Sequence, residues 1–198
     1  MNPRTTRILL ALGAFVAGLV LFSAVVFIVT GRSPAPIAMP SAVGGPFNLV
    51  DQNSKPITDK DMSGHPFLVF FGFTHCPDVC PTTLFDVSEI LRALGPDAKD
   101  VHALFITVDP ERDTPAVMKD YLASFDPRII GVTGDVDAIT AAEKSYRVYA
   151  KKVPTDGGGY TMDHTAIVYL MNKDGRFVAP FNMKRRPEEA AAELKRYL

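Results

Sequence analysis

The N-terminal part of the chain carries one long apolar run. No residue from 8 to 30 is charged, and leucine, valine, alanine, phenylalanine and isoleucine dominate. As a helix this run would be about 34 Å long, enough to cross the hydrocarbon core of a bilayer. The pattern therefore predicts a transmembrane helix over residues 8–30.

From residue 47 onward, short apolar stretches alternate with amphipathic ones. Residues 67–73 are apolar at nearly every position, as in a strand that is buried on both faces. Leu84, Leu91 and Leu94 belong to a set of apolar residues spaced by three or four positions, which indicates an amphipathic helix. The other predicted strands are residues 47–50, 55–58, 101–108, 129–133, 165–171 and 176–181, and further helices are predicted from Thr114-Pro115 onward and over 135–146 and 187–198.

This alternation of strands and helices, closed by a hairpin and a helix, is typical of an α/β sandwich with a mixed sheet flanked by helices. Residues 151–160 contain three glycines and are predicted to form a variable loop. Residues 31–46 are rich in proline, alanine, glycine and serine, which predicts an extended linker. The predicted organisation is one domain of residues 47–198 behind a linker and a membrane helix.

The charged residues predict the orientation of the membrane helix and argue against nucleic acid as a partner. The chain has 21 basic and 22 acidic residues, so nucleic-acid binding has no electrostatic basis. Arg4 and Arg7 precede the apolar run and Arg32 alone follows it closely, which favours a cytoplasmic N-terminus of residues 1–7. The domain is then expected on the periplasmic, or equivalent non-cytoplasmic, side of the inner membrane.

A cleaved signal peptide is the alternative for the same segment. Its apolar region should be about 7–15 residues long and should end at a small-x-small cleavage site. The run observed here is longer and no clean site follows it, so an uncleaved anchor is the preferred interpretation.

The chain has only two cysteines, Cys76 and Cys80, in the segment GFTHCPDVCP of residues 72–81. A proline follows each cysteine and disfavours the helical conformation there, whereas Pro81 suits the first position of a helix. Cys80 is therefore predicted at the N-cap, with both thiols on an exposed turn. The helix dipole should stabilise the thiolates there and lower the pKa of the thiols.

Three structural interpretations compete with a functional site. Buried spectator cysteines fit poorly with the flanking prolines, and a disulfide closing so small a ring would stabilise the fold only modestly. Half of a zinc site would need further cysteine or histidine ligands in paired spacing, which the sequence lacks.

Copper binding and thiol redox chemistry are the two functional interpretations of the pair. Two soft thiolates with one imidazole suit copper in either oxidation state. Of His65, His75, His102 and His164, the best candidate for the imidazole is His164, because it follows the glycine-containing loop that can fold over the cysteine turn. A lone histidine at such a position is more often structural.

Four ordered motifs resemble those of the Sco/SenC family of copper-binding, thioredoxin-like proteins. They are residues 72–81, residues 108–115 (VDPERDTP), residues 146–149 (YRVY) and residues 163–165 (DHT). The resemblance implies a thioredoxin-like fold in which Cys76, Cys80 and His164 bind Cu(I) or Cu(II). It further implies a metallochaperone, not an enzyme, that delivers copper to, or prepares, the binuclear copper site of cytochrome c oxidase subunit II.

The rival function is a membrane-tethered thiol–disulfide oxidoreductase. Cys76 and Cys80 would then form a redox-active disulfide that reduces the oxidase copper-site cysteines, serves another copper or thiol acceptor, or acts in redox signalling. Thioredoxin-type enzymes typically use CxxC with a cis-proline opposite, whereas three residues separate these cysteines and residues 163–165 hold no proline. A peroxide-consuming relative has less support, because no arginine near the cysteines is evident in the sequence.

Overall fold

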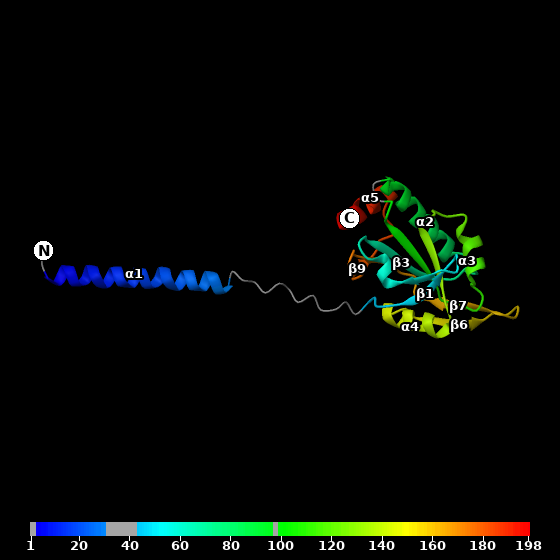
Figure 1. Ribbon diagram of the computed structural model, residues 1–198, viewed down its shortest axis with the longest axis horizontal. Helices are drawn as coiled ribbons and strands as arrows, with labels where there is room; N and C mark the ends of the chain where they lie inside the picture. Colours follow the sequence, from blue (N-terminus) through cyan, green and yellow to red (C-terminus); the bar gives the residue numbers. More distant parts are fainter. Residues whose placement is uncertain (1–2, 31–42, 97–98) are drawn as a thin grey trace. The chain divides into compact units, whose positions relative to one another are not determined.

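The computed structural model describes residues 3–30, 43–96 and 99–198 (Figure 1). The chain divides into two compact units, Met1–Met39 and Pro40–Leu198. The first contains the helix α1 (Pro3–Thr30), several of whose side chains, including those of residues 26–30, lie outside the described part. No helix within the described residues is long and apolar enough to cross a membrane.

The N-terminal segments predicted from sequence therefore stay predictions. This holds for the membrane span over residues 8–30 and for the cytoplasmic tail of residues 1–7, of which residues 1–2 lie outside the described part. It holds too for the linker of residues 31–46, since residues 31–42 are not described.

The second unit is built on a mixed sheet of seven strands in the order β2-β1-β5-β4-β3-β8-β9. The three central strands β3, β4 and β5 run parallel, and β1, β8 and β9 each pair antiparallel with a neighbour. The strands are β1 (Asn48–Asp51), β2 (Pro56–Thr58), β3 (Phe67–Gly72), β4 (His102–Thr107), β5 (Ile129–Thr133), β8 (Val168–Met171) and β9 (Phe177–Pro180).

Helices cover both faces of this sheet, which confirms the predicted α/β class. They are α2 (Val79–Leu94), α3 (Pro115–Leu122), α4 (Val136–Tyr146) and α5 (Pro187–Leu194), with short 3-10 turns η1 (Asp59–Met62) and η3 (Lys195–Tyr197). α2 packs against α5 and α3 packs against β5 on one face, while α4 lies on the other (Figure 1). The two parallel connections place α2 and α3 on the same face, as right-handed crossovers require.

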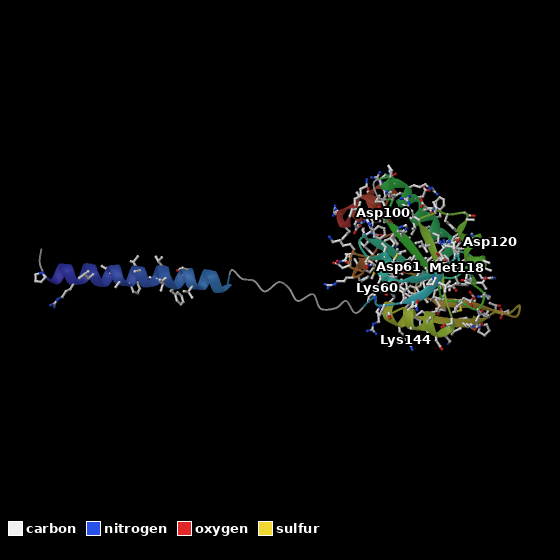
Figure 2. The ribbon with its side chains drawn as sticks, in the orientation of Figure 1. Lys60, Asp61, Asp100, Met118, Asp120 and Lys144 are labelled. Atoms are coloured by element: carbon white, nitrogen blue, oxygen red, sulfur yellow. The ribbon has the colours of Figure 1, made fainter. Side chains whose placement is uncertain are left out.

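The predicted helix starts follow from local chemistry. Thr114 Oγ1 accepts a hydrogen bond from the Val117 amide (3.4 Å), and Pro115 occupies the first position of α3, as predicted. In the same helix Met118 is fully buried against the sheet, whereas Asp120 lies at the outer edge of the domain (Figure 2). This amphipathic pattern orients α3 on the sheet.

The central strand β3 divides the core into two aromatic clusters. All six of its residues are buried, as its uninterrupted apolar sequence predicted. Because side chains alternate along a strand, Phe70 stacks on Phe105 on one face (5.9 Å between ring centroids), while Phe71 packs against Tyr146 of α4 on the other (5.4 Å). The centre of the domain is therefore packed from both sides of a single strand.

The sequence-based prediction was wrong between residues 150 and 167. The predicted loop of residues 151–160 instead forms a hairpin of β6 (Ala150–Pro154) and β7 (Tyr160–His164), which make a separate two-stranded sheet. His164 thus ends β7, and the following strand β8 begins only at Val168. β6 is largely exposed, so its sequence lacks the apolar run that marks a buried strand.

Glu143 of α4 makes stability depend on pH in an unusual direction. Its carboxyl is partly buried, and this desolvation raises its pKa from 4.5 to about 7. Between these two pKa values the folded state binds more protons than the unfolded state. The contribution of the protonated Glu143 carboxyl to stability is therefore present at low pH and is lost as pH rises through 7. Replacing Glu143 by glutamine should remove that loss.

We expect Glu143→Gln to raise the free energy of unfolding by about 1 kcal/mol at pH ~8, after discounting for solvent exposure, and to change it little at pH ~5. Urea unfolding followed by circular dichroism at both pH values would measure this. An equal effect at the two pH values would contradict the assignment.

Candidate metal centre

The two cysteines lie between the end of β3 and the first turn of α2. Cys76 belongs to the turn, and its amide donates to the Phe73 carbonyl (3.3 Å). Cys80 is the second residue of α2, and its amide donates to Cys76 Sγ (3.4 Å). Both cysteines are free thiols in this structure, so the turn holds two sulfur atoms close together without a disulfide.

Two sequence-based expectations for Cys80 were wrong. The N-cap of α2 is Asp78, so Cys80 lies inside the helix and Pro81 occupies its third position. Proline is tolerated there because the first four amides of a helix have no intrahelical acceptor. Cys80 is also fully buried rather than exposed, and this burial raises the pKa of its thiol instead of lowering it. Cys76 is partly buried.

The hairpin brings His164 to Cys80. Cys80 Sγ and His164 Nε2 are 3.8 Å apart, and His164 Nδ1 lies 3.1 Å from the Thr165 carbonyl oxygen. A carbonyl only accepts, so Nδ1 carries the ring proton and Nε2 presents its lone pair to the sulfur. A histidine held this way is oriented for use as a ligand or as a proton acceptor.

Aromatic rings fix the plane of the imidazole. The Phe73 ring meets the His164 ring edge to face, with centroids 5.7 Å apart and planes at 87°. The Phe70 ring approaches it from another side at 6.5 Å. Such contacts restrict ring rotation, so Nε2 is held toward Cys80 by packing as well as by the Nδ1 hydrogen bond.

Asp113 organises the loop beside the cysteines. Its fully buried carboxylate accepts hydrogen bonds from the Thr74 amide (3.0 Å), Thr74 Oγ1 (2.6 Å) and Thr107 Oγ1 (2.7 Å). These bonds compensate for its desolvation and tie the cysteine turn to the end of β4. His75 approaches the same carboxylate at 3.9 Å with a half-exposed side chain.

The remaining histidines lie elsewhere. His65 and His102 line a cavity with Asp61 and Asp100. His102 pairs with Phe67 at the start of β3, whereas the cysteines follow the end of that strand. Of the four histidines, the structure therefore places only His164 against a cysteine sulfur.

Over the described residues, no group of three or more histidine, cysteine, aspartate or glutamate side chains is arranged to hold a metal ion. A surface cleft opens above the site and includes Cys76, Val79, Met162, His164 and Ala166 in its lining. The site is thus a buried sulfur and an imidazole in contact, with a second, more accessible sulfur beside them.

Gly72 is a site residue that sequence reasoning missed. A Cβ atom added there would lie 2.8 Å from Cys80 Sγ and 2.6 Å from Phe105 Cε2. The Cys80 thiol therefore occupies the space that a side chain at residue 72 would take. The signal in the sequence is a lone glycine at the end of a strand that otherwise carries only large apolar side chains.

Comparison with known proteins supplies the family. The model of the SCO1/SenC family matches residues 36–198. The structure of Bradyrhizobium japonicum ScoI with copper bound is 67% identical, aligned over 79% of this chain and 99% of that one, with a TM-score of 0.77. Its mixed α/β architecture is the thioredoxin-like fold predicted here.

Two further similarities extend this result. The mitochondrial SCO2 homolog of Danio rerio is 38% identical over 157 residues, which cover 78% of this chain and 56% of that protein. The chain thus matches little more than half of that relative's length. BsSco, a member of the Sco family of cytochrome c oxidase assembly proteins with a disulfide switch, is 24% identical over 79% of this chain and 94% of that one. Its TM-score is 0.63, and at this identity the likeness supports the fold alone.

Gly72→Ala should force the Cys80 thiol or the Phe105 ring out of place. We expect a loss of about 1–3 kcal/mol in the free energy of unfolding, as for other overpacked cores, and faster alkylation of Cys80. Urea unfolding and thiol labelling of the metal-free chain would measure both. Gly157→Ala is the matched control, because no heavy atom lies within 4 Å of its added Cβ. Wild-type values for Gly72→Ala would show that the space is not needed.

Proposed function

The chain belongs to the SCO1/SenC family, and on that premise we propose that it is a copper-binding protein that assists the assembly of cytochrome c oxidase. The observation that carries the proposal is the 3.8 Å contact between Cys80 Sγ and His164 Nε2, with Cys76 Sγ 3.4 Å from the Cys80 amide. The copper-bound Bradyrhizobium japonicum relative supports the same interpretation.

The proposed ligands are Cys76, Cys80 and His164. Two thiolates and an imidazole form a soft donor set that suits Cu(I) and also accommodates Cu(II). The hydrogen bond from His164 Nδ1 to the Thr165 carbonyl is the kind of outer contact that orients a histidine ligand. Copper is the cargo of this site and not a resident cofactor, so the protein acts as a metallochaperone and not as an enzyme.

The different burial of the two cysteines suggests how the site loads and unloads. Cys80 is buried and protonated at neutral pH, so it gives up a proton when it binds the metal, and copper affinity falls as pH falls. Cys76 is more accessible and turns toward Cys80 and His164 on binding. An acceptor thiolate then reaches the metal from the Cys76 side, and His164 and Cys80 release it last.

We further propose that residues 8–30 anchor the domain as a single-pass helix in the inner membrane. Residues 1–7 lie in the cytoplasm, and the linker of residues 31–46 holds the domain on the periplasmic or equivalent side. The apolar run and the arginine bias around it support this arrangement. The acceptor is cytochrome c oxidase subunit II or another copper or thiol acceptor.

A thiol–disulfide oxidoreductase is the second candidate function. One observation favours it, namely the approach of Cys76 Sγ, in the turn before α2, to the Cys80 amide at 3.4 Å. Two free thiols this close in sequence and space can form a reversible disulfide. In that role Cys76 and Cys80 would reduce the copper-site cysteines of the acceptor.

Anaerobic titration of the reduced chain with Cu(I), with absorption and EPR readout after oxidation, tests the metal proposal. We expect one copper per chain, abolished by Cys76→Ser or Cys80→Ser. His164→Ala should lower the affinity by about tenfold or more, since losing an outer-shell contact already costs 10–100-fold.

His65→Ala is the matched control and should bind copper as the wild type does, because His65 lies beyond the opposite end of β3. An unchanged affinity and spectrum for His164→Ala would remove it as a ligand. Disulfide turnover without any copper binding would favour the oxidoreductase.

A further inference from the structure

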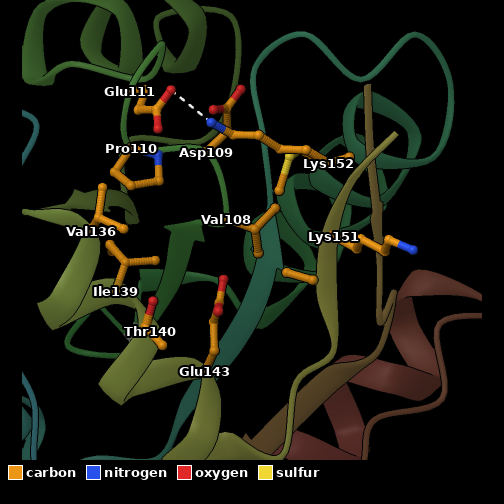
Figure 3. Close-up of a pocket in the computed structure, with 12 residues that line it drawn as sticks. Val108, Asp109, Pro110, Glu111, Val136, Ile139, Thr140, Glu143, Lys151 and Lys152 are labelled. Carbon is orange, nitrogen blue, oxygen red and sulfur yellow. Dashed lines mark ion pairs between the residues drawn. The ribbon is translucent and has the colours of Figure 1, made fainter. Parts of the chain in front are cut away.

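The hairpin that carries His164 has little support from the main sheet. β6 and β7 pair only with each other, and β6 is largely exposed. Between the hairpin and α4 lies a cavity of about 180 Å³, lined in part by Val108, Ile139 and Met162 (Figure 3). The position of β7 over the cysteines therefore depends on a few side-chain contacts at the edges of this cavity.

Arg112 contributes several of these contacts at once. Its guanidinium pairs with the fully buried Asp109 and donates from Nη1 to the Tyr160 carbonyl (3.0 Å). It also lies over the Tyr160 ring, 3.9 Å from the centroid, and 5.9 Å from the centroid of Phe73. One side chain thus joins the loop after β4, the start of β7 and the ring that packs on His164.

Tyr160 and Lys152 complete the same arrangement from the hairpin side. The Tyr160 hydroxyl donates to Asp109 Oδ1 (2.8 Å). Lys152 Nζ lies 4.7 Å from the Tyr160 centroid and pairs with Glu111 (2.7 Å), the contact drawn as a dashed line in Figure 3. The loop of residues 109–112 therefore holds both strands of the hairpin.

We infer that Arg112 is a positioning residue of the metal site: by stacking on Tyr160 and Phe73 and pairing with Asp109, it holds β7 where His164 Nε2 meets Cys80. This inference rests on the proposed function, because it assigns Arg112 a role in arranging the ligands proposed there. Arg112 itself is not a ligand.

Arg112 can affect the position of His164 through two sets of contacts. The first is β7, since Tyr160 pairs with Pro154 and His164 with Ala150 in an unbroken antiparallel register. The second is Phe73, whose ring is shared by the Arg112 guanidinium and the His164 imidazole. Both sets of contacts end at the ring whose Nε2 faces the sulfur.

Arginine is required here for a physical reason. Asp109 has no exposure to water and needs a charged or hydrogen-bonded partner. A planar guanidinium can pair with this carboxylate, donate to a carbonyl and stack on two rings at once, whereas a lysine ammonium supplies only a point charge. Arg112→Lys keeps the charge and removes the planar contacts.

The test compares Arg112→Lys with Arg128→Lys in the full chain. Arg128 is a matched control because it also pairs with a largely buried aspartate, Asp126 (2.8 Å). It precedes the start of β5, whereas the cysteines follow the opposite end of the parallel strands. Tyr160→Phe is a second variant that loses the bond to Asp109 but keeps the ring, in case Arg112→Lys fails to fold.

Two readouts are needed. In the metal-free chain, we expect hydrogen exchange at the amides of β7 to rise by about tenfold or more in Arg112→Lys and less in Tyr160→Phe, with β3 unchanged. In the copper-loaded chain, we expect an altered EPR and sulfur-to-copper absorption spectrum and copper release about 10–100-fold faster. Arg128→Lys should match the wild type in both.

Wild-type exchange and spectra in Arg112→Lys would overturn the inference. Equal effects of Arg128→Lys would overturn it as well, since they would reflect a general loss of stability. Faster exchange of β7 with an unchanged copper spectrum would show that Arg112 holds the hairpin without positioning His164. Failure of the proposed function is seen separately, as a wild-type copper spectrum in His164→Ala.

Discussion

The arrangement of the site depends on the burial of one sulfur atom at the end of the central strand. Cys80 Sγ occupies the space that a side chain at Gly72 would fill, next to the Phe105 ring. Burial there disfavours the thiolate, and the imidazole of His164 lies 3.8 Å from the sulfur. The packing that keeps this thiol neutral thus links the core of the domain to the proposed metal site.

Two buried carboxylates support this arrangement in different ways. Asp113 is satisfied by neutral donors from Thr74 and Thr107, so it needs no cation and binds the cysteine turn to β4. Asp109 instead receives the charged Arg112 of its own loop and the Tyr160 hydroxyl of the hairpin, so part of the compensation for its desolvation comes from the hairpin. The two carboxylates thus fix the two halves of the site, the sulfur side and the imidazole side.

The hairpin differs physically from the rest of the domain. The core strands are held by large buried aromatic contacts such as that between Phe71 and Tyr146, which rearrange only at high cost. The hairpin borders a cavity and is held mainly by polar and cation–π contacts at its edges. A sulfur atom in a rigid core and a histidine on a weakly packed hairpin fit the proposed uptake and release of a metal.

Much of this protein follows from its sequence, because local patterns encode local structure. The buried strand β3, the capped start of α3, and the α/β class are all evident from apolar periodicity and capping residues. The motif around Cys76 and Cys80 also predicts a functional thiol pair, but it leaves copper binding and thiol redox chemistry open. The position of His164 after the glycine-containing loop made it the best histidine candidate, and the family resemblance implies the same residue.

Only the tertiary structure decided the burial of Cys80, the hairpin at β6 and β7, and the roles of Gly72, Arg112 and Tyr160. Residue-by-residue preferences placed Cys80 on an exposed turn, but packing against Gly72 and Phe105 removes its sulfur from water. β6 lacks an apolar run because it is largely exposed. The hairpin's position also involves contacts with a loop some 50 residues away, at separations that no local pattern records.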